Sequence, residues 1–147
     1  SKMPVNTKKL TFFKPELNSE IKLPYINHGV SAGFPSPAMD FMESSIDLNQ
    51  VLVENHTATF YVQVEGNSMI DAGIHDKDLL VVDRSLEPRN NKIAICLLDG
   101  EFTVKRIRLE NNELFLMPEN PNYQPIKITE ENQLIIWGIV TYVIKKL

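Results

Sequence analysis

Short apolar runs separated by turn residues fill the chain from about residue 57 onwards. The run TFYVQVE alternates, with Phe60, Val62 and Val64 on one face, whereas LLVVD is apolar up to its last residue, as in a strand buried on both sides. The runs that predict strands cover residues 59–65, 79–83, 92–98, 101–109, 113–117 and 134–146. Gly138 interrupts the last of these runs, which therefore supplies one or two strands.

Two pairs of turn residues connect neighbouring runs. Asp99-Gly100 stands between two strand-like segments, and this pair is typical of a two-residue hairpin turn with positive φ at both positions. Asn111-Asn112 marks a second turn. The pattern predicts a mainly β domain of short, mostly antiparallel strands.

The first part of the chain has a different character. Residues 1–38 contain several prolines and show no sustained period of two or 3.6 residues, so we predict an extended N-terminal arm there and a folded domain over residues 39–147. Isolated aromatic residues in the arm leave open whether it lies across another surface or is disordered. Residues 39–54 favour a helical turn, with Asp40 as its N-cap. No stretch shows the two amphipathic helices of a helix-turn-helix.

Composition and charge narrow the class of protein. A chain of 147 residues is long enough for one domain with a core and an appendage. The formal net charge of −4 argues against a surface that holds nucleic acid phosphates, so we expect protein partners and no direct sequence-specific DNA binding. The longest apolar run, IAICLL at 93–98, is far shorter than a membrane span, and no secretory signal is visible, so we expect a cytoplasmic protein. The single Cys96 lies in that run and is expected to be a buried thiol.

The segment VSAGFPSPAMDF at 30–41 combines the small residues Ala32 and Gly33 with two prolines that keep the backbone extended. One interpretation is a linker. The other is a protease substrate, which a cleft binds as a strand.

Candidate catalytic groups are few. In VEGNSMID, Gly66 and Asn67 form a sharp turn that projects the Ser68 hydroxyl beside backbone N–H groups, as a nucleophile requires, although an ordinary turn would look the same. None of the three histidines stands where it would complete a Ser-His-Asp triad. Lys105, in the middle of a predicted strand, could serve as the base if it is desolvated, since a buried lysine loses its proton more readily. A lysine on the solvent face of the strand is the alternative.

Taken together, these segments resemble the LexA-like self-cleaving Ser/Lys peptidases, and within them the branch that acts in SOS mutagenesis. The resemblance covers nearly the whole chain, through LTFFKP, AGFPSPAMDF, the long segment IDLNQVLVENHTATFYVQVEGNSMIDAGIHDKDLLVVD, DGEFTVKRI, ENPNYQPI and WGIVTYVI. It implies a LexA-like peptidase fold, Ser68 as nucleophile, Lys105 as general base and Ala32-Gly33 as the bond that is cut. It also implies that the backbone amides of Asn67 and Ser68 form the oxyanion hole, and that no metal or cofactor is needed.

The same resemblance implies a set of partners: a second copy of the chain in a homodimer, a RecA filament on single-stranded DNA that stimulates cleavage, and a UmuC-type Y-family polymerase that the processed dimer joins in translesion synthesis. Three other classes stay open. The chain could be the regulatory domain of a LexA-type repressor or a non-catalytic interaction module. A type I signal peptidase shares the Ser/Lys chemistry but needs a membrane anchor, which this sequence does not show.

Overall fold

The structure is a computed structural model that describes residues 10–16, 22–26 and 42–147. These residues fall into two compact units, one with residues 10–15 and 55–147, the other with residues 16, 22–26 and 42–54. The predicted arm boundary at residue 38, the Ala32-Gly33 bond, His28 and Asp40 lie outside the described residues. Among those described, no helix is both long and apolar enough to cross a membrane.

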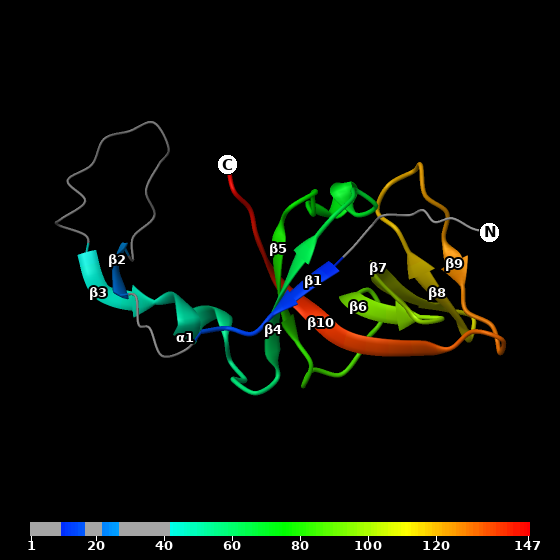
Figure 1. The fold of residues 1–147 in the computed structure, drawn as a ribbon, viewed down its shortest axis with the longest axis horizontal. Coiled ribbons are helices and arrows are strands. Elements are labelled where there is room, and N and C mark those ends of the chain that lie inside the picture. The colour runs from blue at the N-terminus through cyan, green and yellow to red at the C-terminus, as the bar shows by residue number, and fades with distance from the viewer. Residues whose placement is uncertain (1–9, 17–21, 27–41) are drawn as a thin grey trace. The chain divides into compact units, whose positions relative to one another are not determined.

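The larger unit is built on one eight-stranded sheet in which every neighbouring pair is antiparallel (Figure 1). The strand order is β1-β4-β5-β10-β6-β7-β8-β9. The strands are β1 (Leu10–Phe13), β4 (Thr59–Val64), β5 (Leu79–Asp83), β6 (Ile93–Leu98), β7 (Glu101–Glu110), β8 (Glu113–Met117), β9 (Ile126–Lys127) and β10 (Leu134–Ile144). The mainly antiparallel β prediction is confirmed.

Both predicted turns are present and close tight hairpins. Asp99 and Gly100 have φ values of 48° and 87°, and they join β6 to β7 with Leu98 opposite Glu101. Asn111 and Asn112 have φ values of 53° and 63° and join β7 to β8. Positive φ at both turn residues matches the right-handed twist of the flanking strands, so the β6-β7-β8 meander is fixed by local sequence.

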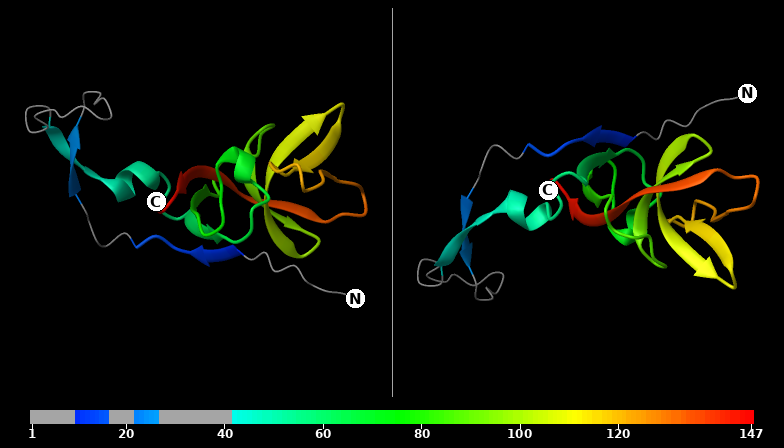
Figure 2. Two further views of the ribbon diagram at one scale, coloured as in Figure 1. Left: turned by 90° about the horizontal axis from the view of Figure 1, so that it is seen from above. Right: turned by 90° about the horizontal axis from the view of Figure 1, so that it is seen from below.

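The last apolar run is a single strand that changes partner. The first half of β10 pairs with β6 and the second half with β5, with register shifts between Ile136 and Gly138 and between Val140 and Tyr142. In both views of Figure 2, β10, coloured orange to red, runs lengthwise through the middle of the larger unit. A Cβ atom added at Gly138 would lie 2.6 Å from Val82 Cγ1, so glycine permits the close approach of β10 to β5.

Side chains on the two faces of the sheet form two apolar clusters. On β6 and β7, Ile95 and Val104 join one cluster, whereas Cys96 and Ile107 join the other, as the alternation of a strand requires. The first cluster consists of Val62, Val64, Met69, Ile74, Leu80, Val82, Ile95 and Val104. The second consists of Ala94, Cys96, Ile107, Leu116 and Ile139.

The predicted arm contains two strands that its sequence did not predict, and β1 shows that part of the arm does lie across another surface. β1 pairs with β4 in the larger unit, and β2 (Lys22–Ile26) pairs with β3 (Met42–Asp47) in the smaller one. Segments of four and five residues are too short to show a hydrophobic period. Their conformation comes from pairing with strands far along the chain.

The smaller unit also holds the predicted helical turn, as α1 (Leu48–Leu52). The Asp47 carboxylate accepts a hydrogen bond of 3.0 Å from the Asn49 N–H and is the N-cap. The expectation of Asp40 as the cap is therefore wrong. The residues just before the helix form β3, so the helix begins later than the sequence suggested.

Asp83, at the end of β5, is a buried carboxylate held by hydrogen bonds. It is 4% exposed and accepts from the Ser85 hydroxyl at 2.6 Å, the Asn55 side-chain amide at 2.9 Å and the Ser85 N–H at 2.8 Å. Burial alone would raise the pKa of Asp83, but the hydrogen bonds from Ser85 and Asn55 outweigh it and lower the pKa below its ordinary value.

We expect Asp83→Ala to lower the free energy of unfolding by about 1–3 kcal/mol at pH 7, because it removes a buried acceptor and leaves its donors unpaired. A carboxylate whose pKa is lowered on folding stabilises the protein above its unfolded pKa, near 3.9, and this stabilisation is lost as the pH falls through the folded pKa. The difference in the free energy of unfolding between the wild type and Asp83→Ala should therefore shrink below about pH 4. Urea unfolding at a series of pH values measures it, with Glu87→Ala, whose side chain is 84% exposed, as control. A difference that stays constant to pH 2.5 would contradict the expectation.

Candidate active site

Ser68 lies on a sharp turn between β4 and the short 3-10 helix η2 (Ile70–Ala72). Gly66 has a φ of 97°, a conformation that disfavours a side chain, and its N–H donates to Asp76 Oδ1 at 2.8 Å. Met69, directly after the serine, is 2% exposed and belongs to the first apolar cluster. The turn is thus fixed on both sides of a half-buried Ser68.

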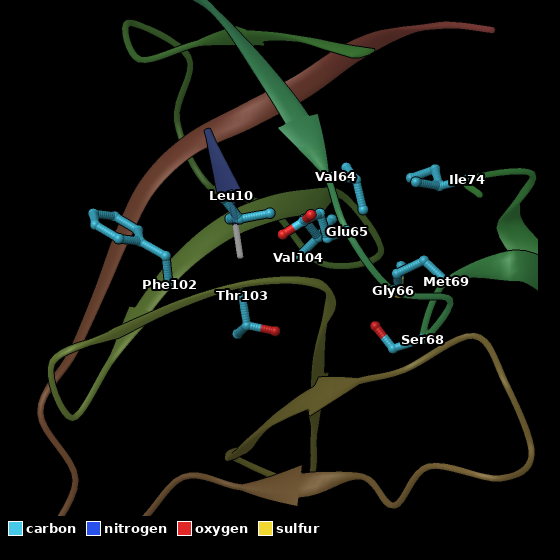
Figure 3. Close-up of a pocket in the computed structure, with 10 residues that line it drawn as sticks. All are labelled: Leu10, Val64, Glu65, Gly66, Ser68, Met69, Ile74, Phe102, Thr103 and Val104. Atoms are coloured by element: carbon cyan, nitrogen blue, oxygen red, sulfur yellow. The ribbon is translucent and has the colours of Figure 1, made fainter. Parts of the chain in front are cut away.

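A narrow cleft separates this turn from β7. Its cavity volume is about 20 Å³, room for one water molecule, and its walls include Leu10, Val64, Ser68, Phe102, Thr103 and Val104. Figure 3 shows the Ser68 side chain on the turn and the Thr103 side chain on β7 at this cleft. Leu10 brings β1, from the N-terminal part of the chain, to the same place.

The segment that follows β8 makes hydrogen bonds to the turn that carries Ser68. The Ser68 carbonyl accepts a hydrogen bond from the Glu119 N–H at 2.8 Å, and the Asn67 carbonyl accepts one from Asn120 Nδ2 at 2.9 Å. The Tyr123 hydroxyl donates to Asn67 Oδ1 at 3.1 Å. Asn120 is 5% exposed, so its side-chain amide is buried where it helps to fix the backbone of the serine turn.

Sequence reasoning assigned no role to this segment. The signal for it was ENPNY, a cluster of turn residues directly after a strand. Its partner on the serine turn could not be read from spacing, since more than fifty residues separate Asn67 from Asn120.

The backbone amides of Asn67 and Ser68 donate no hydrogen bond to any residue that the structure describes, whereas both carbonyls are engaged. The assignment of these two N–H groups to an oxyanion hole stays a prediction.

Lys105 is buried, and the alternative of a solvent-facing lysine is wrong. It is 7% exposed, pairs with Ala94 across β6 and β7, and shares its face with Ile107 of the second apolar cluster. Its Nζ donates to Thr103 Oγ1 at 2.7 Å and to the Val104 carbonyl at 3.2 Å. Because Thr103 also lines the Ser68 cleft, one hydrogen bond connects the lysine amine to the wall of that cleft.

An ion pair also connects β7, on one side of the cleft, to the segment that supports the serine turn on the other side. Arg106, next to the lysine on β7, pairs with the carboxylate of Glu119, whose N–H holds the Ser68 carbonyl. Arg106 also donates to the Asn91 carbonyl at 2.6 Å. The strand that carries Lys105 and the turn that carries Ser68 are thereby tied to one segment.

Cys96 confirms the prediction of a buried thiol. It is fully buried, and burial raises the pKa of the Cys96 thiol to about 12, an effect that the charge of Lys105 partly opposes. The thiol is therefore protonated at neutral pH and is no rival nucleophile to Ser68.

The described histidines lie away from the serine. His75 is exposed on the loop before β5, where its Nδ1 is 3.0 Å from Lys145 Nζ, and His56 is exposed before β4. Neither lines the Ser68 cleft. Within the described ranges, no three His, Cys, Asp or Glu side chains gather as they would around a metal ion.

Comparison with known proteins gives one family. Residues 24–141 match the family described as Peptidase S24-like. Protein SamA of Salmonella typhimurium is 44% identical over 123 residues, which cover 84% of this chain and 85% of SamA. Protein MucA of Salmonella typhimurium is 40% identical over 121 residues, 82% of each chain. The LexA repressor of Ectopseudomonas mendocina is 39% identical over 130 residues, 88% of this chain and 63% of the repressor.

These matches agree with the predominantly antiparallel sheet and with the small helical content of the described residues. They confirm the LexA-like fold that the sequence predicts. The chain belongs to the Peptidase S24-like family, the self-cleaving peptidases that its sequence resembles.

Proposed function

We propose that this chain is a UmuD-like serine endopeptidase that cuts its own Ala32-Gly33 bond, with Ser68 as nucleophile and Lys105 as general base. The observation that carries the proposal is the buried Lys105 amine, which donates to Thr103 on the wall of the cleft that contains Ser68. A Ser/Lys peptidase needs a desolvated lysine near its serine, and the burial of Lys105 and its hydrogen bond to the cleft wall support that assignment.

In the proposed reaction, the neutral Lys105 amine takes the proton of the Ser68 hydroxyl as Ser68 Oγ attacks the Ala32 carbonyl carbon. The oxyanion that forms accepts hydrogen bonds from the amides of Asn67 and Ser68. The Lys105 ammonium then gives its proton to the Gly33 nitrogen as that bond breaks. Water hydrolyses the resulting ester of Ser68, with Lys105 again accepting the proton.

The hydrogen bonds of Lys105 suit this role. A neutral amine has two N–H donors and one lone pair, and Thr103 Oγ1 and the Val104 carbonyl are two acceptors for those donors. An ordinary lysine, with a pKa of about 10.4, is neutral in about 0.04% of molecules at pH 7, so removal of water from Lys105 by the docked substrate would speed the reaction.

The substrate segment has small residues where it would have to approach a narrow cleft. Small side chains on both sides of the bond let an extended backbone come close to Ser68. The chain between Gly33 and Ser68 can span roughly 100 Å, several times the radius of a domain of this size, so cleavage within one chain and cleavage between two copies are both sterically feasible.

The biological setting is proposed from the relatives. We infer that the protein acts in the cytoplasm in the SOS response to DNA damage, that a RecA filament on single-stranded DNA stimulates cleavage, and that the processed homodimer joins a UmuC-type Y-family polymerase in translesion synthesis. The identity of 44% with SamA and of 40% with MucA over most of the chain supports this setting. The 39% identity with a LexA repressor supports a second candidate, the regulatory self-cleaving domain of such a repressor.

Intact-mass spectrometry of the purified protein at pH 7 and pH 10 tests the proposed chemistry. We expect fragments 1–32 and 33–147, formed faster at pH 10 because more of the lysine is neutral, and no fragments from Ser68→Ala. If no cut occurs at either pH, even with RecA filament added, the chain is a non-catalytic interaction module.

A further inference from the structure

Two strands that precede the proposed cut are paired with strands that follow it. β1 pairs with β4 through four residue pairs, from Leu10 opposite Val64 to Phe13 opposite Tyr61. Separately, β2 pairs with β3, with Lys22 opposite Asp47. Breaking the Ala32-Gly33 peptide bond removes neither ladder.

Side chains of β1 add to its backbone pairing. The Phe12 ring lies 4.9 Å from the Phe102 ring and 4.8 Å from the Trp137 ring, measured between centroids. Phe60 extends this aromatic cluster, at 5.1 Å from Trp137. Leu10 and Phe12 both pack on the first apolar cluster, whereas Phe13 is 47% exposed. β1 therefore lies at the edge of the sheet, with one apolar face half-buried against the first apolar cluster.

We propose that the fragment 1–32 stays bound after the cut, as a strand added to the outer edge of β4, and that its release is a separate and slower step. This rests on the proposed self-cleavage. The binding surface consists of the β4 backbone and the rings of Phe60, Phe102 and Trp137. Its occupant is residues 10–13 of the same chain.

General physics supports retention. An extended peptide that adds a strand to an exposed edge gains affinity from main-chain hydrogen bonds and specificity from alternate side chains, here Leu10 and Phe12. Two short ladders on one fragment also act together, since each holds the other at a high effective concentration. A fragment attached at β4 and at β3 leaves only when both pairings open.

Release would change two parts of the larger unit. The β4 backbone would become an open sheet edge, able to accept an extended segment of a partner. Leu10 would leave the wall of the Ser68 cleft, which would widen it.

The test separates retention from self-cleavage. In a Ser68→Ala chain, residues 30–36 are replaced by the recognition sequence of a specific added protease, so that the cut does not depend on Lys105 or Ser68. After the cut, size-exclusion chromatography with intact-mass detection shows whether the fragment elutes with the body. Emission from Trp137, the single tryptophan, follows release in time, because Phe12 lies against its ring.

We expect the N-terminal fragment to coelute with the body that follows the inserted site, and Phe12→Ala to release it at least tenfold faster. Phe13→Ala is the matched control, since this ring is on the other side of β1, and should change the rate less than twofold. An excess of a synthetic peptide of residues 8–16 should displace the fragment from the cut Ser68→Ala protein. This result would show, without a further substitution, that the fragment is bound at β4. Elution of the parent fragment on its own, or equal release from Phe12→Ala and the parent, would overturn the proposal. Neither result bears on self-cleavage.

Discussion

The Lys105→Met protein should cleave itself at least about a thousandfold more slowly than the wild type at pH 7, and raising the pH to 10 should not restore the cleavage rate. Methionine has nearly the length of lysine and suits an apolar environment, but it cannot accept the serine proton. A positioned general base contributes about 10²–10⁴ in rate, and a nucleophile and base that act as a unit lose nearly all activity when either is removed. The rate constants for loss of intact mass at pH 7 and pH 10 measure the effect.

Lys127→Met is the control for Lys105→Met. Lys127 is 54% exposed and pairs with Glu113 on the neighbouring strand, away from the Ser68 cleft. Its variant should show the wild-type rise of cleavage with pH. A Lys105→Met protein that unfolds at the wild-type urea concentration, yet cleaves with the wild-type pH profile, would rule out Lys105 as the base.

Leu80→Ala should lower the free energy of unfolding by about 2–5 kcal/mol, because it removes buried methyl groups and leaves a cavity. Leu80 is fully buried on β5, between β4 and β10, in the same apolar cluster as Met69. The cavity would thus lie in the core that supports the serine turn. Urea unfolding in a Ser68→Ala background measures stability without interference from self-cleavage.

Leu86→Ala provides the comparison for Leu80→Ala. Leu86 is 41% exposed, and a surface truncation of this kind usually changes stability by less than about 0.5 kcal/mol. A loss below 1 kcal/mol for Leu80→Ala would mean that the first apolar cluster does not unfold with the rest of the sheet.

The elements that the sequence predicted well are those with local signals. The alternation in TFYVQVE, the continuous run LLVVD and the hairpin pairs Asp99-Gly100 and Asn111-Asn112 act over a few residues, and each matches a strand or turn of the structure. Cys96, inside an apolar run, was correctly expected to be buried for the same reason.

Features that depend on distant partners were missed. β1 and β2 are too short for a period and gain their structure from β4 and β3. The alternation along β7 puts the side chains of Lys105 and Val104 on different faces of the sheet. It could not show that the Lys105 face is covered, since Leu116 and Ile139, which belong to the covering cluster, come from other strands. The support of the serine turn by Asn120 depends in the same way on a contact far along the chain.

The burial of Cys96 makes the chain's only thiol a reporter of sheet opening. With a pKa of about 12, the thiol is ionised in about one molecule in 10⁵ at pH 7, and its position on β6 keeps reagents away. Alkylation by a maleimide or exchange with an aromatic disulfide therefore requires transient separation of β6 from its neighbours. The rate of thiol labelling in native buffer then measures how often the centre of the sheet opens, and comparison of the intact and cut chains would show whether the cut loosens it.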